Sequence, residues 1–280
     1  SISSLNNAPN VIIEANPLSG VIAIAAGSNH TVALLDNGTV MAWGDNGKGQ
    51  SEIPEVLPYA QSISAGYNST HIVFGGDIKA ISNYNYDASY GLTNNGFVKD
   101  LYYDETFNGG TKKISSNNYG LIGLYSGGEI WTEGTPEDNY GFKVISSGYQ
   151  HYLALKDNGD LVGMGYDSDG GEVDDAVNYS DVISISAGYR ASTVLHSNGS
   201  VESFGDNGYV PEGGISNVVA ISYSYYHALV LKSDGTVVSW GYDDFGETVV
   251  PEGLKDVVAI ASGYQTSFAL KSDGTIVRWG

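Results

Sequence analysis

A short string of residues occurs seven times along the chain, and this repetition constrains the fold more than any other feature. The first copy is Ile24-Ala25-Ala26-Gly27, and later copies begin at Ile63, Ile114, Ile145, Ile185, Ile221 and Ile260. A turn follows each copy and ends at Gly38, Gly76, Gly128, Gly159, Gly199, Gly235 or Gly274. The spacings of the two markers agree to within one residue, so each repeat is predicted to be one structural unit.

Each unit carries the pattern of antiparallel strands. The turn between the second and third strands reads Asp-Asn-Gly or Ser-Asp-Gly in several units, and such turns accept the positive φ angles of hairpins. The third strand ends in an aromatic residue and a glycine at Trp43-Gly44, Phe204-Gly205, Trp240-Gly241 and Trp279-Gly280. A short fourth strand, as at 247–250, is expected to complete the unit. Four strands in about 40 residues is the size of a β-propeller blade.

The expected fold is therefore all-β: a single seven-bladed β-propeller of about 40-residue blades that spans residues 1–280. The predicted repeats are 20–59, 60–110, 111–141, 142–180, 181–217, 218–256 and 257–280 combined with 11–19. The last repeat lacks a fourth strand, and residues 11–14 align with 247–250 without a gap. We expect this N-terminal strand to close the ring and remove an exposed sheet edge. The seven marker isoleucines and Trp43, Trp240 and Trp279 should be buried.

The charge balance excludes several classes of partner. Twelve Lys and Arg against 32 Asp and Glu give a net charge of −20, which repels phosphate backbones and anionic lipid. The chain has no Cys, so it has no disulfide, thiolate nucleophile or Cys-based zinc site. Its longest aliphatic run, 21–26, is too short to span a bilayer. We expect a soluble monomer that binds no nucleic acid and does not insert into a membrane.

The sequence offers no convincing catalytic or metal site. His30, His151 and His227 occupy one position of the repeat, so repetition accounts for them without a shared metal. Residues 167–172 resemble a calcium loop but lack its full ligand spacing. Nucleophile-elbow, Walker and His-Glu-x-x-His motifs are absent. We expect no enzyme activity, no metal and no cofactor.

One face of the predicted ring is rich in tyrosine. The loops that join strands one and two should lie on the same side as those that join strands three and four, and they contribute Tyr67, Tyr84, Tyr86, Tyr119, Tyr149, Tyr166, Tyr189, Arg190, Tyr225, Tyr226, Tyr242 and Tyr264. The same loops supply Asp45, Asp167, Asp206 and Asp243. Tyrosine gives a large contact area at a small entropic cost, and this favours a partner-binding surface. The alternative is that the rings only pack against neighbouring blades.

The longest repeat, 60–110, carries an apparent insertion from Tyr84 to Gly110 that is rich in aromatic residues. Long loops in compact domains are usually functional or disordered, and the aromatic content argues against disorder. We expect the insertion to overhang the tyrosine-rich face and take part in recognition. Alternatively, the short third repeat has lost its own fourth strand and borrows packing from its neighbour.

The pattern Val-x-Ala-Ile-Ala-x-Gly-x-x-His-x-x-Ala-Leu, followed by Asp-Gly-Thr-Val and Trp-Gly, resembles the repeats of the regulator of chromosome condensation superfamily. The resemblance implies a seven-bladed propeller. The unit length, Gln50 and a Pro-Glu pair near the blade end are most similar to the secreted bacterial beta-lactamase inhibitor protein II subgroup. In that subgroup, aromatic residues at the second position of the loop between strands one and two contact the target, and only Tyr119 and Tyr226 match that position.

Together these features favour a macromolecular binding module that recognises a protein partner, as an inhibitor or a receptor-binding domain. The aspartates around the tyrosines should steer a cationic partner. A carbohydrate-binding, lectin-like propeller is the alternative, since Tyr, Asp and Asn also suit sugar rings. The subgroup resemblance implies a secreted or cell-surface bacterial protein.

Overall fold

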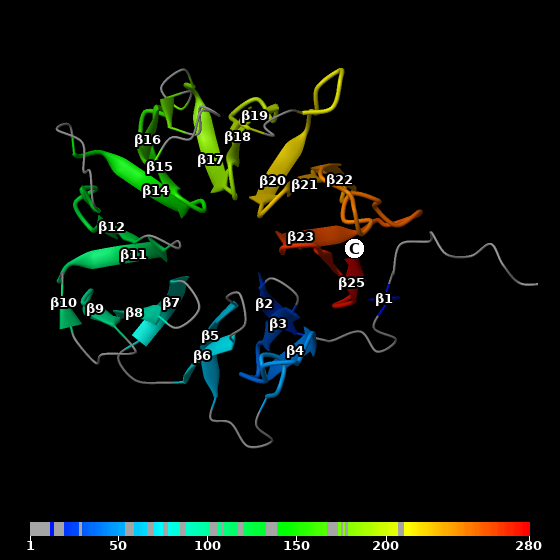
Figure 1. Cartoon of the computed structure of the whole chain (residues 1–280), viewed down its shortest axis with the longest axis horizontal. Coiled ribbons are helices and arrows are strands. Elements are labelled where there is room, and N and C mark those ends of the chain that lie inside the picture. The colour runs from blue at the N-terminus through cyan, green and yellow to red at the C-terminus, as the bar shows by residue number, and fades with distance from the viewer. Residues whose placement is uncertain are drawn as a thin grey trace, which may run out of the picture.

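The sheets of the protein are arranged around a common centre, and their innermost strands are β2, β5, β7, β11, β14, β17, β20 and β23 (Figure 1). The computed structural model describes residues 12–13, 20–27, 30–53, 59–65, 70–74, 78–84, 88–100, 106–107, 109–116, 120–132, 139–166, 173–174, 176, 179–206 and 210–280. Within these ranges, 25 strands form eight antiparallel sheets. None of the helices described is long and apolar enough to cross a membrane.

The strands follow one another in chain order. The first half contains β1 (Ile12–Ile13), β2 (Val21–Ala26), β3 (His30–Leu35), β4 (Val40–Gly44), β5 (Ala60–Ala65), β6 (Thr70–Phe74), β7 (Ile78–Tyr84), β8 (Ala88–Thr93), β9 (Val98–Asp100), β10 (Thr106–Phe107), β11 (Thr111–Ser116), β12 (Leu121–Tyr125) and β13 (Ile130–Trp131). The second half contains β14 (Phe142–Ser147), β15 (His151–Lys156), β16 (Leu161–Gly165), β17 (Val182–Ala187), β18 (Ala191–His196), β19 (Val201–Gly205), β20 (Val218–Tyr223), β21 (His227–Lys232), β22 (Val237–Gly241), β23 (Val257–Ser262), β24 (Ser267–Lys271) and β25 (Ile276–Trp279).

The predicted count of seven units is wrong in the second repeat. Residues 60–110 contain two sheets, β5-β6 and the four-stranded β7-β8-β9-β10, so the described residues hold eight sheets. The stretch from Tyr84 to Gly110 is therefore not an overhanging insertion. It holds the end of one hairpin and a turn at Gly96, whose φ is 87°. A further Ile-Ser marker, Ile81-Ser82, begins this sheet. Its spacing to the neighbouring markers departs from 40, and this departure concealed it.

The turns between the second and third strands form for a local reason. In several of these turns, the side chain of the residue before the glycine accepts a hydrogen bond from the amide two residues on. Examples are Thr39 N–H to Asn37 Oδ1 at 2.9 Å and Thr236 N–H to Asp234 Oδ1 at 3.0 Å. The glycine that ends each of these two turns has a positive φ, 77° at Gly38 and 79° at Gly235. The Asp-Asn-Gly and Ser-Asp-Gly signals thus predicted these hairpins correctly.

The fourth strand expected at 247–250 is absent. Val249 N–H donates to Gly246 O within a tight turn, and the Glu247 carboxylate accepts the Phe245 amide at 2.8 Å. These local hydrogen bonds occupy backbone groups that a fourth strand would need. By contrast, β1 does pair antiparallel with β25, with Ile12 opposite Arg278 and Ile13 opposite Val277.

The core lies between adjacent sheets and is built mainly from their second strands, whose residues Val32, Leu153 and Leu229 are fully buried. Trp240 and Trp279 are buried as predicted, but Trp43 is only half-buried. Among the marker isoleucines only Ile185 is buried, while Ile24, Ile63, Ile114, Ile145, Ile221 and Ile260 are half-buried. The inner strand is an edge strand with a single pairing neighbour, so its side chains are only partly covered.

Serine at the position after the marker isoleucine joins one sheet to the next. Ser146 Oγ accepts the Ala187 amide at 3.1 Å, and Ser186 Oγ accepts the Tyr223 amide at 2.8 Å. Ser222 Oγ accepts the Ser262 amide at 3.0 Å. The Ile-Ser marker therefore combines a packing residue with a hydrogen-bond acceptor that fixes the height of the neighbouring inner strand.

The repeated histidines also join neighbouring sheets. The Nε2 atoms of His30, His151 and His227 lie 2.8–2.9 Å from the hydroxyls of Thr70, Ser192 and Ser267, respectively. The Ser267 hydroxyl donates onward to Glu247 O at 2.8 Å, and the Thr70 hydroxyl donates to Gln50 O at 2.6 Å. All three histidines thus have one structural role, as their common repeat position indicates.

We predict a pH-dependent contribution of His227 to stability. Burial lowers the pKa of His227 to about 4, although Asp243 partly opposes this shift. The unfolded chain takes up this proton near pH 6.5, whereas the folded protein resists it. Stability should therefore fall as the pH drops from 6.5 to 4, by at most about 1.4 kcal/mol per pH unit from this group. Urea unfolding of the wild type and His227→Gln across this window measures the difference, and identical pH slopes would contradict the prediction.

Candidate partner-binding surface

The two kinds of loop expected on the tyrosine-rich face do lie side by side in three sheets. In each of them, the residue after the third strand donates its amide to the loop between strands one and two. Tyr166 N–H donates to Gln150 O, Asp206 N–H to Arg190 O and Tyr242 N–H to Tyr226 O, at 2.8–2.9 Å. These bonds place the side chains of both loops at the same end of the sheet.

The glycine at the end of the third strand makes this arrangement possible. Gly241 has a φ of 116°, and a Cβ atom at this position would lie 2.3 Å from Tyr226 O. Only glycine fits both the backbone conformation and the close approach. The aromatic-glycine motif thus brings Tyr242 beside Tyr226, with ring centroids 5.7 Å apart.

Six tyrosines from four consecutive sheets form one continuous group, which we call the Tyr cluster. Its members are Tyr149, Tyr189, Tyr225, Tyr226, Tyr242 and Tyr264. The closest pairs are Tyr149–Tyr189 and Tyr189–Tyr225, both with centroids 4.4 Å apart, and Tyr225–Tyr264 at 4.5 Å. Such distances are typical of attractive aromatic pairs.

Tyr225 is the centre of the Tyr cluster. Its ring contacts Tyr149, Tyr189, Tyr226 and Tyr264. Burial, followed by the neighbouring phenols, raises the pKa of Tyr225 well above 10. The rings nevertheless remain half-buried, and Tyr242 is 56% exposed. The tyrosines thus pack against neighbouring sheets, as the alternative reading of the sequence predicted, and still present an aromatic surface to solvent.

The charged residues around the Tyr cluster are partly engaged with one another. Arg190 Nη1 lies 2.9 Å from Asp206 Oδ2 in an exposed ion pair. Asp243 accepts the Thr248 amide at 2.8 Å, and a hydrogen bond to Asp244 raises the pKa of Tyr242. Burial raises the pKa of Tyr226, and Arg190 partly opposes that shift. The rim therefore combines acidic groups with one paired cation.

Not all predicted site residues join the Tyr cluster. Tyr166 is 64% exposed and lies outside it, and Asp45 lines a separate cavity between β4 and β25. Tyr67, Tyr86, Tyr119, Asp167 and the side chain of Tyr84 lie outside the part of the chain that the structure describes. Among the described residues, the rings that join the cluster come from the last four sheets, and the sequence did not predict which rings would be in contact.

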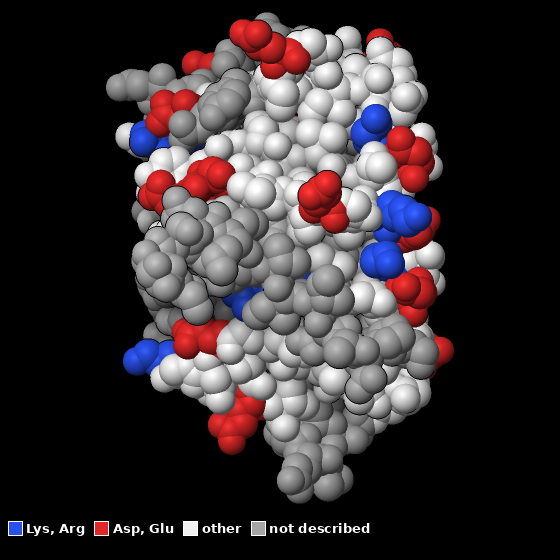
Figure 2. Space-filling view, turned by 90° about the vertical axis from the view of Figure 1, so that its right-hand side faces the viewer, with Lys and Arg blue, Asp and Glu red and all other residues white. Residues whose placement is uncertain are grey.

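The side of the molecule that carries β25 shows the acidic character of the surface (Figure 2). Asp and Glu lie along both edges of this side and also in its middle, Lys and Arg are fewer, and uncharged residues occupy much of the upper part between the edges. This distribution agrees with the net charge of −20. No group of three or more potential metal ligands occurs in the described residues, and the calcium-like stretch 167–172 lies outside them.

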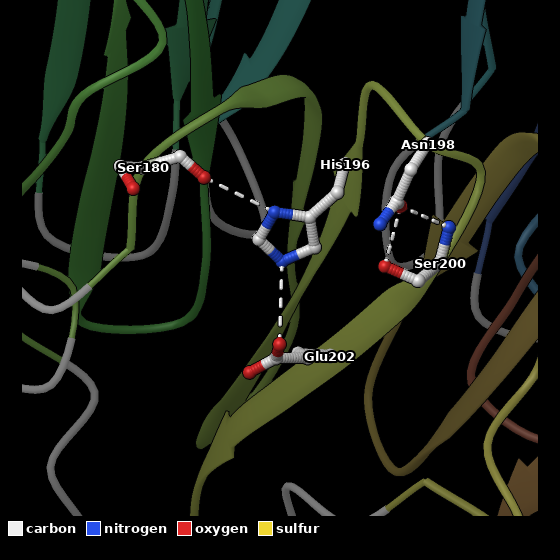
Figure 3. Close-up of polar contacts among 5 residues, drawn as sticks. All are labelled: Ser180, His196, Asn198, Ser200 and Glu202. Carbon is white, nitrogen blue, oxygen red and sulfur yellow. Dashed lines mark hydrogen bonds and ion pairs between the residues drawn. The ribbon is translucent and has the colours of Figure 1, made fainter.

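A second hollow lies at the opposite end of the β17–β19 sheet, beside the turn at Asn198 (Figure 3). His196 lies between two groups there: its Nδ1 is 3.1 Å from Ser180 O, and its Nε2 is 3.6 Å from Glu202 Oε1. Asn198 Oδ1 accepts hydrogen bonds from the amide and the hydroxyl of Ser200. These contacts all hold the turn and its flanking strands together, which is a structural role.

We predict that Tyr225 makes stability sensitive to alkaline pH. The folded protein holds the Tyr225 proton more tightly than the unfolded chain does. The free energy of unfolding should therefore keep its full value below pH 10 and decline as the pH rises further. Tyr225→Phe removes the ionisable hydroxyl and should flatten the decline. Thermal unfolding between pH 8 and 11 tests this, with Tyr166→Phe as a control outside the cluster. An unchanged slope in Tyr225→Phe would refute the prediction.

The comparison with known families supports the repeat assignment. The family model of the Regulator of chromosome condensation (RCC1) repeat matches residues 21–50, 142–170 and 218–247. These segments begin with β2, β14 and β20, the inner strands of three sheets. No curated protein sequence matches the chain.

Several solved structures share the fold at low sequence identity. The CRINKLY WD40 ectodomain of the Arabidopsis thaliana receptor kinase ACR4 has a TM-score of 0.63 at 15% identity and covers 94% of this chain and 96% of its own. Human WBSCR16 has a TM-score of 0.60 at 15% identity, and the match covers 94% of this chain and 87% of WBSCR16. Yeast RCC1 (Prp20), solved with Kap60, has a TM-score of 0.59 at 16% identity, and the match covers 93% of this chain and 80% of the yeast chain. The repeat matches and these likenesses together support an RCC1-type propeller.

Proposed function

We propose that the Tyr cluster is the centre of a protein-binding surface and that the chain acts as a non-catalytic binding module. The observation that carries this proposal is the merging of six half-exposed or exposed rings from four sheets into one surface. Tyrosine is enriched at the energetic centres of interfaces, because its ring buries a large area and loses little rotamer freedom. Yeast RCC1, a structural neighbour, was solved bound to another protein, Kap60.

The charge around the Tyr cluster favours a cationic partner. Asp206 is paired with Arg190 and remains 37% exposed, and Asp243 and Asp244 are exposed beside Tyr242. These groups belong to a chain with a net charge of −20, which attracts cations over long distances at low salt. A secreted or cell-surface setting and a role as an inhibitor or receptor-binding domain are further parts of the proposal.

A protein partner suits the geometry better than a sugar. The inter-ring angles range from 24° to 75°, so the rings form a faceted surface rather than separate flat platforms. A repeat-based lectin would present one similar pocket in each unit, whereas the Tyr cluster is one continuous surface shared by four units. A glycan array distinguishes this second reading from the first.

Alanine substitution tests the proposed surface. The partner is first captured from host or competitor extracts and identified, and its affinity is then measured by surface plasmon resonance. Tyr189→Ala with Tyr226→Ala should weaken binding by about 2 kcal/mol or more, roughly 30-fold, while the melting temperature shows that the fold survives. Tyr59→Ala, an exposed tyrosine whose hydroxyl binds Asp36 O, is the matched control outside the cluster. Normal binding by the double variant would end the proposal.

Salt dependence tests the charge argument separately. The association rate of a cationic protein should fall as ionic strength rises from 20 to 300 mM, because salt screens the acidic rim. Replacing Asp243 and Asp244 with Asn should make the association rate less dependent on salt and leave the dissociation rate nearly unchanged. A rate insensitive to salt would favour a neutral ligand such as a glycan.

We also propose that the pairing of β1 with β25 closes the ring of sheets. The inner strands β2 and β23, which belong to the first and last sheets, contact each other, and β1 adds a fourth strand to the last sheet. Deletion of residues 1–16 should expose the edge of β25 and cause aggregation or a large loss of stability. Light scattering and thermal unfolding measure both effects, with deletion of residues 1–10 as the control. Monomeric behaviour and unchanged melting after the longer deletion would disprove closure.

A further inference from the structure

One position in the third strand is small in four sheets and arginine in the last. The residue paired with the third residue of the second strand is Ala42, Gly163, Ser203 or Ser239 in these four sheets. The equivalent residue is Asp100 in β9 and Arg278, paired with Phe268, in β25. At Gly163 there is no room for a larger residue, since a Cβ atom would lie 2.6 Å from Val173 O. Arg278 therefore departs from the small residues that these four sheets have at this position.

Arg278 lies on the side of the last sheet that faces the first sheet. Residues alternate sides along a strand, so Ile276 and Arg278 share one side of β25 and Val277 and Trp279 share the other. Val277 and Trp279 pack with residues of the β20–β22 sheet. Ile276 packs against Ala33 in β3 and lies near Trp43. The guanidinium of Arg278 thus belongs to the junction between the β2–β4 and β23–β25 sheets.

A cavity of about 720 Å³ occupies this junction. Its walls include Trp43, Asp45, Phe245, Gln265, Phe268 and Arg278. Three aromatic side chains with a few polar groups are typical of small-molecule sites, and the volume lies in their usual range of about 300–1,000 Å³. The cavity also explains why Trp43 is half-buried, whereas Trp240 and Trp279 in the equivalent positions are buried.

Arg278 brings a positive charge to this cavity without a compensating group. It is half-buried, and in the described part of the chain no hydrogen bond or ion pair reaches its guanidinium. Burial lowers the pKa of Arg278. Asp45, a carboxylate in the same wall, is engaged elsewhere, because it accepts hydrogen bonds from the Gly47 amide at 3.0 Å and from Gln50 Nε2 at 2.8 Å. A partly buried cation without a partner is costly, and an anionic ligand would remove that cost.

We propose that this cavity binds a carboxylate that carries an apolar group. The planar guanidinium can donate two parallel hydrogen bonds to a carboxylate, and Trp43, Phe245 and Phe268 provide an apolar surface for the rest of the ligand. The negative charge of Asp45 in the same wall favours a single anionic group over a dianion such as a phosphate monoester. The carboxylate can belong to a free acid or to the C-terminus of a peptide. This inference does not depend on a role for the Tyr cluster.

Trp43 fluorescence provides a direct test with the full chain. We expect 3-phenylpropanoate to cause a saturable change and the neutral 3-phenylpropanamide to bind at least tenfold more weakly, because the amide lacks the charge that Arg278 recognises. The peptide Gly-Gly-Phe with a free or an amidated C-terminus distinguishes a peptide source from a free acid. Trp43→Phe should abolish the signal while calorimetry still detects binding.

Arg278→Ser, which copies Ser203 and Ser239 of the other sheets, should weaken acid binding at least tenfold while the protein melts cooperatively. Arg278→Lys keeps the charge but not the two-pronged geometry, and its affinity should be intermediate. Lys271→Ser removes an equal charge at the far end of the same sheet, where Lys271 lies 3.4 Å from Asp273, and should leave binding unchanged. Absence of saturable binding for both acids, equal binding of the amides, or full affinity in Arg278→Ser would each overturn the proposal.

Discussion

Hydrogen bonds between neighbouring inner strands set the positions of the last four sheets relative to one another. Three of these bonds join a serine hydroxyl of one sheet to a backbone amide of the next, as Ser186 does with Tyr223. A backbone amide has a fixed position in its strand, so these bonds set the height of one sheet against the next more sharply than apolar packing does. The histidines repeat this connection farther out, at the start of the second strand. Together they hold the loops of successive sheets at one level.

The Tyr cluster is a consequence of that alignment. The loops of β14-β15, β17-β18 and β20-β21 each begin with a glycine and a tyrosine or with a serine and a tyrosine. Because neighbouring sheets are held at the same level, the rings from adjacent loops are in contact, with centroids 4.4 Å apart. The backbone contributes as well, since the Tyr149 amide donates to Gly188 O and the Tyr189 amide donates to Ser224 O of the next loop. The Tyr cluster is thus part of the repeat architecture rather than an addition to it.

The sequence predicted the sheets well where all its signals occur together. In 181–205 and 218–241 the Ile-Ser marker, the turn and the aromatic-glycine end are all present, and the strands lie where expected. Prediction failed in 60–110, where two units share the length of one and the spacing no longer marks the boundary. It failed at 247–250 as well, because a side chain, the carboxylate of Glu247, stabilises a turn there. The order of strands and loops in each repeat was enough to predict that the tyrosines share one face. The contacts between their rings depend on distances between sheets, which the sequence of a single repeat does not determine.

The pairing of β1 with β25 has a mechanical consequence. Ile12 lies opposite Arg278 and Ile13 opposite Val277, so the chain enters β1 and leaves β25 at the same end of the ladder. A force that pulls these two ends apart would load the hydrogen bonds one after another, as in opening a zip, rather than all at once in shear. The junction between the first and last sheets is therefore the place where tension would open the molecule. The same tension would pull directly on the strand that carries Arg278.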